Sequence, residues 1–235
     1  CMGGRVSRFD ASTGQVANVS PWPVNSYGAN PLTVKYRYGW VTPMAFTPTQ
    51  PRALLYGAQV LFQSTDEGDH WQVISPDLTG TTAQAQDCSA QATGEQARAC
   101  GFGVISTIAP SPKSAGLIWV GTDSGLIQLT RDDGQHWQNV TPPALQPWEK
   151  VSAIDASALD AGTAYAAVDA HRQDDFHPHV FRTHDYGTTW TEVDAGLPSD
   201  EDVPVVRADT IRSGLMYAST SEGVYVSLDD GDPWQ

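Results

Sequence analysis

The sequence has no apolar run approaching the ~20 residues that a membrane-spanning helix requires. Basic residues are also scarce, because 13 Lys and Arg stand against 27 Asp and Glu, for a formal net charge of −14. Such a charge repels phosphate backbones and anionic lipid surfaces. We therefore expect neither a membrane span nor a nucleic-acid partner.

Stretches rich in helix-forming residues are missing as well. The 21 glycines and 16 prolines, with many Thr, Ser and Val, are typical of strands and turns. Hydrophobic residues make up 40% of the chain, which is enough to build a core. The composition predicts an all-β globular fold with very little helix.

Cysteine is rare, and only Cys88 and Cys100 lie near each other in the sequence. A disulfide between them would stabilise the fold by roughly 3 kcal/mol in the chain-entropy model and would indicate an oxidising compartment. Two unlinked thiols are the alternative. On the disulfide interpretation, we expect the protein to be extracellular or periplasmic.

One eight-residue pattern occurs four times: Ser or Thr, any residue, Asp, any residue, Gly, two further residues and Trp. It appears as STDEGDHW, TRDDGQHW, THDYGTTW and SLDDGDPW, beginning at residues 64, 130, 183 and 227. Recurrence at such intervals predicts an array of similar units.

Each unit also contains short apolar segments typical of strands, such as VISTIAPSP, LIWVGT and LIQLT before the second copy and WQNVT at its end. Four antiparallel strands in some 40 to 45 residues are the size of one blade of a β-propeller. We predict blades at 38–79, 103–143 and 150–197, a partial blade at 1–22, an incomplete blade at 203–235 and a loop insertion at 80–102. The incomplete ends predict a segment of about four blades, with the remaining blades of a larger propeller as partners.

The repeated residues suit a hairpin between the third and fourth strands of a blade. Glycine supplies the positive φ of a tight turn, Asp accepts hydrogen bonds from turn N–H groups, and Trp packs between neighbouring blades. We predict a structural role for Asp66, Gly68, Trp71, Asp132, Gly134, Trp137, Asp185, Gly187, Trp190, Asp229, Gly231 and Trp234.

The four strings resemble the Asp-box, or BNR, repeat of bacterial sialidases, xyloglucanases and sortilin-type receptors. SPDLTG, IAPSPKSAGLIWVGTDSG and SEGVYVSLDDG look like segments of large secreted bacterial proteins described as sortilin-like or glycosyl-hydrolase-like BNR proteins. The resemblance covers most of the chain from about Gly4 to Gln235. It implies a β-propeller fold and defines no activity.

Strand order places the four hairpins on one face of the propeller and the long insertions on the other. These insertions are 20–40, the Cys88–Cys100 loop, 141–150 and 169–180, and loops on a rigid scaffold often bind ligands. Rings suited to stacking on a sugar or anchoring a protein lie there; the candidate binding residues are Trp22, Tyr36, Arg37, Tyr38, Trp40 and Trp148. Plain packing at the blade ends is the alternative.

Catalysis and metal binding find less support. A glycosidase generally needs two carboxylates, for which Asp123, Glu149, Asp174 and Asp175 are candidates on the same face. The Arg-Ile-Pro triplet typical of sialidases is missing.

His177 and His179 are two residues apart, but zinc needs three or four ligands and loop histidines are more often solvated or hydrogen-bonded. We expect no metal and no cofactor.

The sequence thus favours a secreted propeller that serves as a protein or carbohydrate binding scaffold, with no catalysis of its own in this segment. The alternative is a polysaccharide-active glycoside hydrolase whose cleft lies on the face opposite the hairpins.

Overall fold

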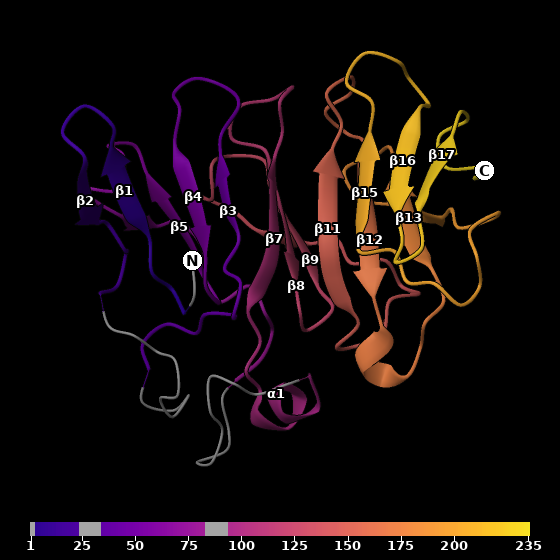
Figure 1. Ribbon diagram of the computed structural model, residues 1–235, viewed down its shortest axis with the longest axis horizontal. Coiled ribbons are helices and arrows are strands. Elements are labelled where there is room, and N and C mark those ends of the chain that lie inside the picture. Colours follow the sequence, from indigo (N-terminus) through magenta and orange to yellow (C-terminus); the bar gives the residue numbers. More distant parts are fainter. Residues whose placement is uncertain (1–2, 24–33, 83–93) are drawn as a thin grey trace.

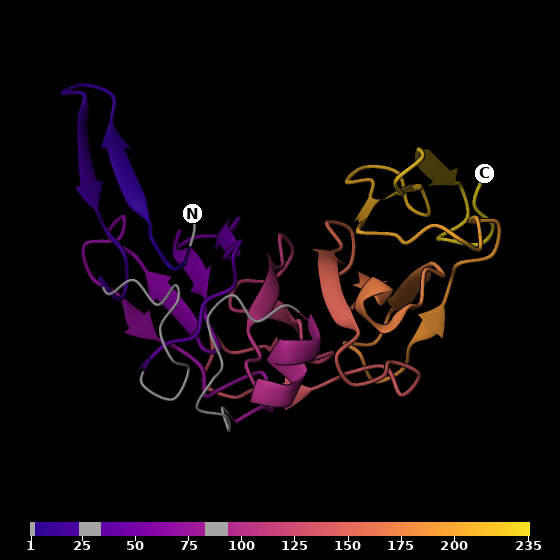
Figure 2. The same cartoon turned by 60° about the horizontal axis from the view of Figure 1, so that its bottom comes forward.

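The computed structural model describes residues 3–23, 34–82 and 94–235. Five antiparallel sheets follow one another in this part of the chain, and we call them blades 1 to 5 (Figures 1 and 2). Helix in these residues is limited to α1 (Gly94–Cys100) and the 3-10 helix η1 (His171–Gln173). The predicted all-β fold of four-stranded antiparallel sheets is confirmed.

Every blade is a simple meander in which each strand pairs with the next one along the chain. Blade 1 contains β1 (Ser7–Asp10) and β2 (Gln15–Asn18); blade 2 contains β3 (Met44–Phe46), β4 (Leu54–Gly57), β5 (Leu61–Ser64) and β6 (Gln72–Val73). Blade 3 contains β7 (Ile105–Pro110), β8 (Ile118–Thr122), β9 (Ile127–Thr130) and β10 (Gln138–Asn139). Blade 4 contains β11 (Lys150–Ala156), β12 (Ala164–Asp169), β13 (His179–Thr183) and β14 (Thr191–Glu192), and blade 5 contains β15 (Val205–Ala208), β16 (Met216–Ser219) and β17 (Val224–Ser227).

The core lies between neighbouring blades. Strands β4, β8 and β12 are buried along their whole length because both faces of their sheets are covered. Strand β16 instead alternates between buried and more exposed residues, as expected for a sheet with one covered face. The first strands of the blades lie side by side, with β3 against β7, β7 against β11 and β11 against β15.

The repeated strings form the hairpins after the third strands, and we call them motif hairpins. In the first, Gly68 N–H donates to Ser64 Oγ at 2.8 Å, while Asp66 accepts the Ser64 hydroxyl at 2.9 Å and His70 N–H at 2.8 Å. Thr130 and Asp132 repeat these contacts in the second hairpin. The hydroxyl residue that opens the motif therefore closes the turn together with the Asp.

Each motif tryptophan reaches back to the preceding blade. Its indole N–H donates to the carbonyl oxygen of the residue directly after that blade's last strand. The pairs are Trp71 to Val19 at 2.7 Å, Trp137 to Ile74 at 3.0 Å, Trp190 to Val140 at 2.7 Å and Trp234 to Val193 at 2.7 Å. The motif glycine packs on the same residue, so that a Cβ at Gly68 would lie 2.9 Å from Val19 Cβ. These contacts support a structural role for the motif at each blade junction.

The motif carboxylates predict a loss of stability in acid. The backbone N–H and imidazole of His70 lower the pKa of Asp66 from 3.8 to about 2, and His136 does the same for Asp132. Because these pKa values are depressed in the folded protein, the stabilisation is present above about pH 4 and is lost towards pH 2. We expect urea unfolding to show this loss, and the double variant Asp66→Asn, Asp132→Asn to show a weaker pH dependence. An unchanged dependence in the double variant would contradict the assignment.

One feature of the insertion at 80–102 differs from the predicted loop. Its described end forms α1, whose Ala97 and Cys100 pack against Phe102 and Val104. Cys100 is disulfide-bonded; Cys88, its predicted partner, lies outside the described residues. No helix in the described ranges is long and apolar enough to cross a membrane.

Candidate functional site on the loop face

The face opposite the motif hairpins carries the connections from second to third strands and from each blade to the next. Helix α1 and η1 both lie along this edge, at the bottom of Figure 1, whereas the β1–β2 turn lies at the top. We call this edge the loop face.

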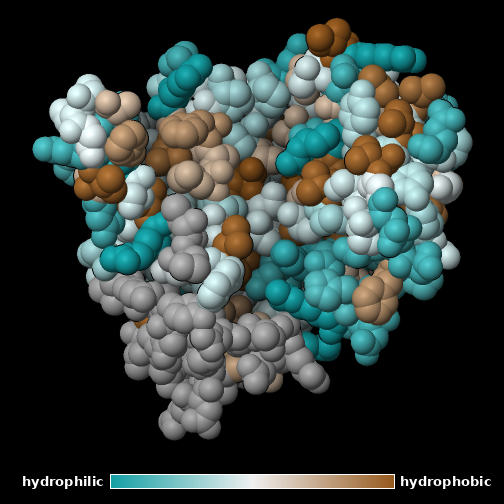
Figure 3. All heavy atoms as spheres, in the orientation of Figure 1, coloured by the Kyte–Doolittle hydropathy of each residue, from teal (hydrophilic) through white to brown (hydrophobic). Residues whose placement is uncertain are grey.

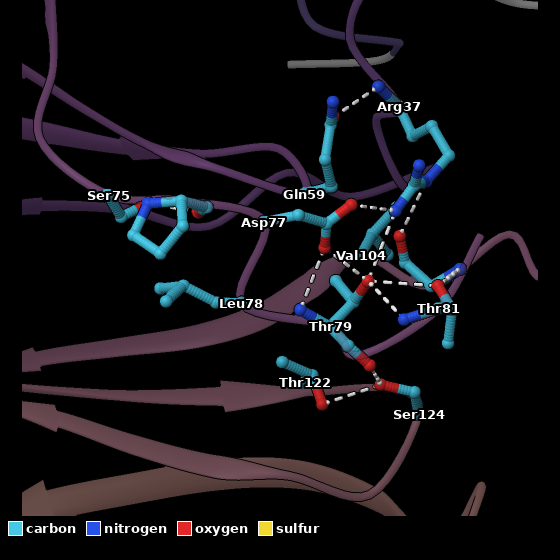
Figure 4. A network of polar contacts seen from close by, with 12 residues as sticks. Arg37, Gln59, Ser75, Asp77, Leu78, Thr79, Thr81, Val104, Thr122 and Ser124 are labelled. Atoms are coloured by element: carbon cyan, nitrogen blue, oxygen red, sulfur yellow. Dashed lines mark hydrogen bonds and ion pairs between the residues drawn. The ribbon is translucent and has the colours of Figure 1, made fainter. Parts of the chain in front are cut away.

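A buried polar network holds the loop-face ends of blades 2 and 3 together (Figure 4). Arg37 is only 8% exposed, and its guanidinium donates to Asp77 at 2.7 Å, to Thr79 Oγ1 at 3.1 Å and to the Gly103 carbonyl at 3.0 Å. Asp77 also accepts the Thr79 hydroxyl at 2.6 Å. A guanidinium with this many protein partners positions the chain around it, and we assign Arg37 that role.

The network continues into blade 3. Ser124 Oγ donates to the Thr79 carbonyl at 2.8 Å, and Gly103 N–H donates to Thr81 Oγ1 at 3.1 Å. A Cβ at Gly103 would lie 2.6 Å from Thr81 Oγ1, so glycine allows the two segments to meet. The turn that carries Asp123 is therefore fixed on both sides.

Asp123 follows β8 in the turn to β9 on this face. Its Oδ1 accepts the Val104 N–H at 2.7 Å. Burial raises the pKa of the carboxyl from 3.8 to about 6, against the opposing effects of the Val104 N–H and of the positive charges of Arg172, Lys150 and Arg37. A carboxyl that titrates near neutral pH among cations is typical of a functional site.

The connection 146–150 is bonded to the turn that carries Asp123. Trp148 N–H donates to the Ser124 carbonyl at 2.8 Å, and the ring packs against the cluster of Phe102 and Val104. Trp148 has a φ of 71°, a left-handed conformation that is rare for a bulky residue. Such strain is often found at functional sites. We call Asp123, Trp148, Lys150 and Arg172 together the mouth.

The segment 169–180 contacts the connection 146–150. Gln173 Nε2 donates to the Pro147 carbonyl at 3.4 Å, which brings η1 and its Arg172 onto the connection 146–150. The space-filling view shows that hydrophilic residues prevail on this part of the visible surface (Figure 3).

The predicted aromatic residues fall into two groups. Trp22 and Tyr36 meet edge to face at 5.8 Å, and the Lys35 ammonium lies 4.7 Å from the Trp22 ring. Trp40 is 57% exposed, whereas Tyr38 is 1% exposed and belongs to the core. Tyr36 also packs edge to face on Phe62 of the core at 4.8 Å, so the exposed Trp40 and the packed Tyr36 and Tyr38 have different surroundings.

The four candidate carboxylates differ in their surroundings. Glu149 accepts the Gln146 N–H at 2.8 Å, and Asp174 is exposed at the end of η1. The pKa of Asp175 is lowered to about 2, mainly by the backbone N–H and imidazole of His177. The pKa of Asp123, in contrast to that of Asp175, is raised towards neutrality.

Sequence reasoning missed three members of the site. Asp77 follows Pro76 in the SPDLTG string, where nothing indicated that it would pair with Arg37. Lys150 and Arg172 lie in insertions for which the sequence predicts binding through aromatic and acidic side chains. Counting the basic residues in each insertion would have found both, because basic residues are scarce.

A cavity of about 220 Å³ lies on the opposite face, between blades 4 and 5. There Asp230 accepts the Tyr165 hydroxyl at 2.5 Å and contacts His184 Nε2 at 2.9 Å. Asp230 also pairs with Arg182 at 3.2 Å. These bonds join the two blades, so the junction itself accounts for this cluster.

The raised pKa of Asp123 predicts how stability changes at neutral pH. The carboxyl ionises more readily in the unfolded chain, so raising the pH from about 4 to above about 6 favours unfolding. Asp123→Asn keeps an acceptor for Val104 N–H and removes the buried charge. We expect the variant to be more stable than the wild type at about pH 7 and equally stable at about pH 4 in urea unfolding. Lower stability at both pH values would contradict this explanation.

The chain is similar to parts of solved β-propeller proteins, and its fold is that of a partial β-propeller. It superposes on the GH74 enzyme of Niastella koreensis with a TM-score of 0.66 and 17% identity over 99% of this chain and 34% of that one. For an ancestral GH74 enzyme the TM-score is 0.60, with 22% identity over 88% and 25%. For the extracellular domain of a putative one-component system of B. thetaiotaomicron it is 0.56, with 9% identity over 96% and 25%.

The chain therefore spans about a quarter to a third of the length of these proteins. No family model matches it, and no curated protein resembles it in sequence. At identities this low, the superpositions show a common fold alone.

Proposed function

We propose that the chain is part of an extracellular or periplasmic Asp-box propeller whose loop face binds a protein or carbohydrate ligand, without catalysis by the described residues. The mouth is the observation that carries this proposal. It combines a strained Trp148 with the charges of Asp123, Lys150 and Arg172, contributed by loops that the polar network and η1 hold in place. An aromatic ring beside a few polar groups is the usual composition of a binding site.

The carboxylates support binding over catalysis. Retaining and inverting glycosidases both need an acid and a second carboxylate beside it. Asp175 already accepts the His177 N–H at 3.0 Å and contacts His179 Nε2 at 3.1 Å, so we assign this carboxylate to holding its own loop. Export is supported by the disulfide-bonded Cys100 and by the extracellular domain among the similar structures.

The test is a panel of immobilised glycans and peptides, with chromatography of the eluate to detect products. We expect retention without product. Trp148→Ala should weaken retention about tenfold, since stacking on an aromatic ring contributes on the order of 1 kcal/mol or more. Phe9→Ala, which removes an exposed ring from β1 on blade 1, is the matched control and should change nothing. Equal loss in both variants, or retention of no panel member, rejects the proposal.

The second candidate is a polysaccharide-active glycoside hydrolase whose cleft is completed elsewhere in the protein. It is favoured by Asp123, whose pKa of about 6 suits a general acid, and by the GH74 enzymes among the similar structures. Release of product that disappears in Asp123→Asn or Glu149→Gln would establish this candidate in place of the first.

A further inference from the structure

The loop that carries Arg172 contains three histidines, each beside a carboxylate. His171 Nδ1 contacts Asp169, and His177 Nδ1 lies 2.8 Å from Asp175. The third, His179, opens β13 and is bound from both sides. Histidine–carboxylate pairs also occur at the motif hairpins, so the geometry of each pair decides whether it is unusual.

His179 differs from the other two because both of its ring nitrogens face carboxylates. Nδ1 lies 3.0 Å from Glu192 on β14, and Nε2 lies 3.1 Å from Asp175 in the loop. An ionised carboxylate only accepts hydrogen bonds, and a neutral imidazole donates from one nitrogen only. Both contacts are therefore satisfied only when His179 is an imidazolium ion.

Asp175 connects His179 to the rest of the loop. The same carboxylate accepts the His177 N–H at 3.0 Å, so it fixes the backbone that returns to β13. Three residues earlier is Arg172, in η1, whose last turn is closed by Asp174 N–H donating to the His171 carbonyl at 3.1 Å. The bond between Asp175 and His179 thus ties this short segment to the sheet.

We propose that His179 is a positioning residue that clamps the loop 170–178 when protonated, and thereby holds Arg172 at the mouth beside Asp123. Deprotonation removes one of the two bonds to His179 and loosens the loop. The inference rests on the proposed function only where it concerns ligand binding, since the clamp itself operates without a ligand. Binding at the mouth is then stronger in mildly acidic than in alkaline solution.

The charges around His179 favour its protonated form, in agreement with stronger clamping at low pH. Burial lowers the pKa of His179, but hydrogen bonds and charges from Glu192 and Asp175 outweigh burial and raise it above its ordinary value of 6.5. Stabilisation from a raised histidine pKa is present at low pH and is lost as the pH rises through the folded value. Two other groups lie near His179. His177 contacts the same Asp175 carboxylate, and Val168, the residue paired with His179 on β12, is uncharged. Asp123 ionises near pH 6, and its negative charge then attracts Arg172. This attraction strengthens as the pH rises, whereas the clamp weakens.

Hydrogen exchange of the peptide 170–178, corrected for the intrinsic effect of pH, tests the clamp without a ligand. Between about pH 5.5 and about pH 8.5 we expect exchange to accelerate about tenfold, which is the loss of one charge-assisted hydrogen bond. His179→Lys, which keeps the positive charge, should stay protected at both pH values. His179→Gln should exchange rapidly at both. His136→Gln, which removes a histidine–carboxylate pair from the opposite face, should behave as the wild type.

A wild-type loop whose corrected exchange does not change with pH, or a His179→Lys variant with the same pH dependence as the wild type, overturns the proposal. If His179→Lys does not fold, Glu192→Gln replaces it. That variant should lower the midpoint of the His179 imidazole titration followed by NMR, and an unchanged midpoint would also overturn the proposal. Binding of glycans or peptides is measured separately at each pH. If none of them binds, the proposed function is refuted, but the exchange result still stands.

Discussion

Replacing Gly134 by alanine is expected to destabilise the protein by roughly 2 to 5 kcal/mol. Gly134 has a φ of +89°, and a Cβ there would lie 2.3 Å from the Ile74 carbonyl oxygen and 3.0 Å from Ile74 Cβ. The left-handed conformation costs about 1 to 2 kcal/mol for any L-residue, and the collision with backbone adds to it. Blades 2 and 3 would have to separate at their junction. Urea unfolding followed by tryptophan fluorescence measures the change.

Gly14 provides the matched control. It also has a positive φ, of +71°, in the β1–β2 hairpin, but no atom lies within 4 Å of the Cβ position. Gly14→Ala should therefore show the conformational cost alone. Equal destabilisation by the two substitutions would mean that the contact with Ile74 contributes nothing to the junction.

Trp137→Ala is expected to cost about 3 kcal/mol, the lower end of the range for truncating a packed aromatic residue. The lower end applies because the side chain is half-buried. Its ring packs against the cluster formed by Leu55, Leu61, Leu78, Ile105, Ile118 and Val120, and its indole N–H donates to the Ile74 carbonyl at 3.0 Å. Truncation removes both contributions from the junction of blades 2 and 3. Thermal and urea unfolding give the change.

Trp137→Phe separates these contributions. Phenylalanine retains much of the packing but leaves the Ile74 carbonyl without its donor, so about 1 kcal/mol should be lost. In both variants ligand retention at the loop face should persist below the melting temperature. Loss of binding by folded Trp137→Phe would contradict the separation of the hairpin face from the loop face.

The blades could be predicted from sequence because local patterns determine them. The Asp, Gly and Trp of the four strings fix a hairpin within eight residues, and alternating apolar segments supply the strands around it. The junction bonds were predicted only in outline: packing of Trp137 between blades follows from its size, whereas its acceptor at Ile74 depends on a register 63 residues away.

The site was harder to predict for the same reason. Tyr38 and Trp40 have similar sequence surroundings, yet Tyr38 is 1% exposed and Trp40 57%, because the ring of Tyr38 fills the space above Gly4. Arg37 and Asp77 are 40 residues apart and meet only when blade 2 is folded. The position of Asp123 in a loop predicts a candidate carboxylate, but its pKa depends on burial and on cations from three separate segments.

The motif indoles all point in one direction along the chain, since every one donates to a residue that precedes it by 41 to 63 positions. When a blade leaves the ribosome, the segment that carries its acceptor carbonyl has therefore already been synthesised, and the blade can pack against the preceding one. Assembly is expected to proceed vectorially from the amino terminus, and ribosome-bound chains truncated after each hairpin should gain protease resistance one blade at a time.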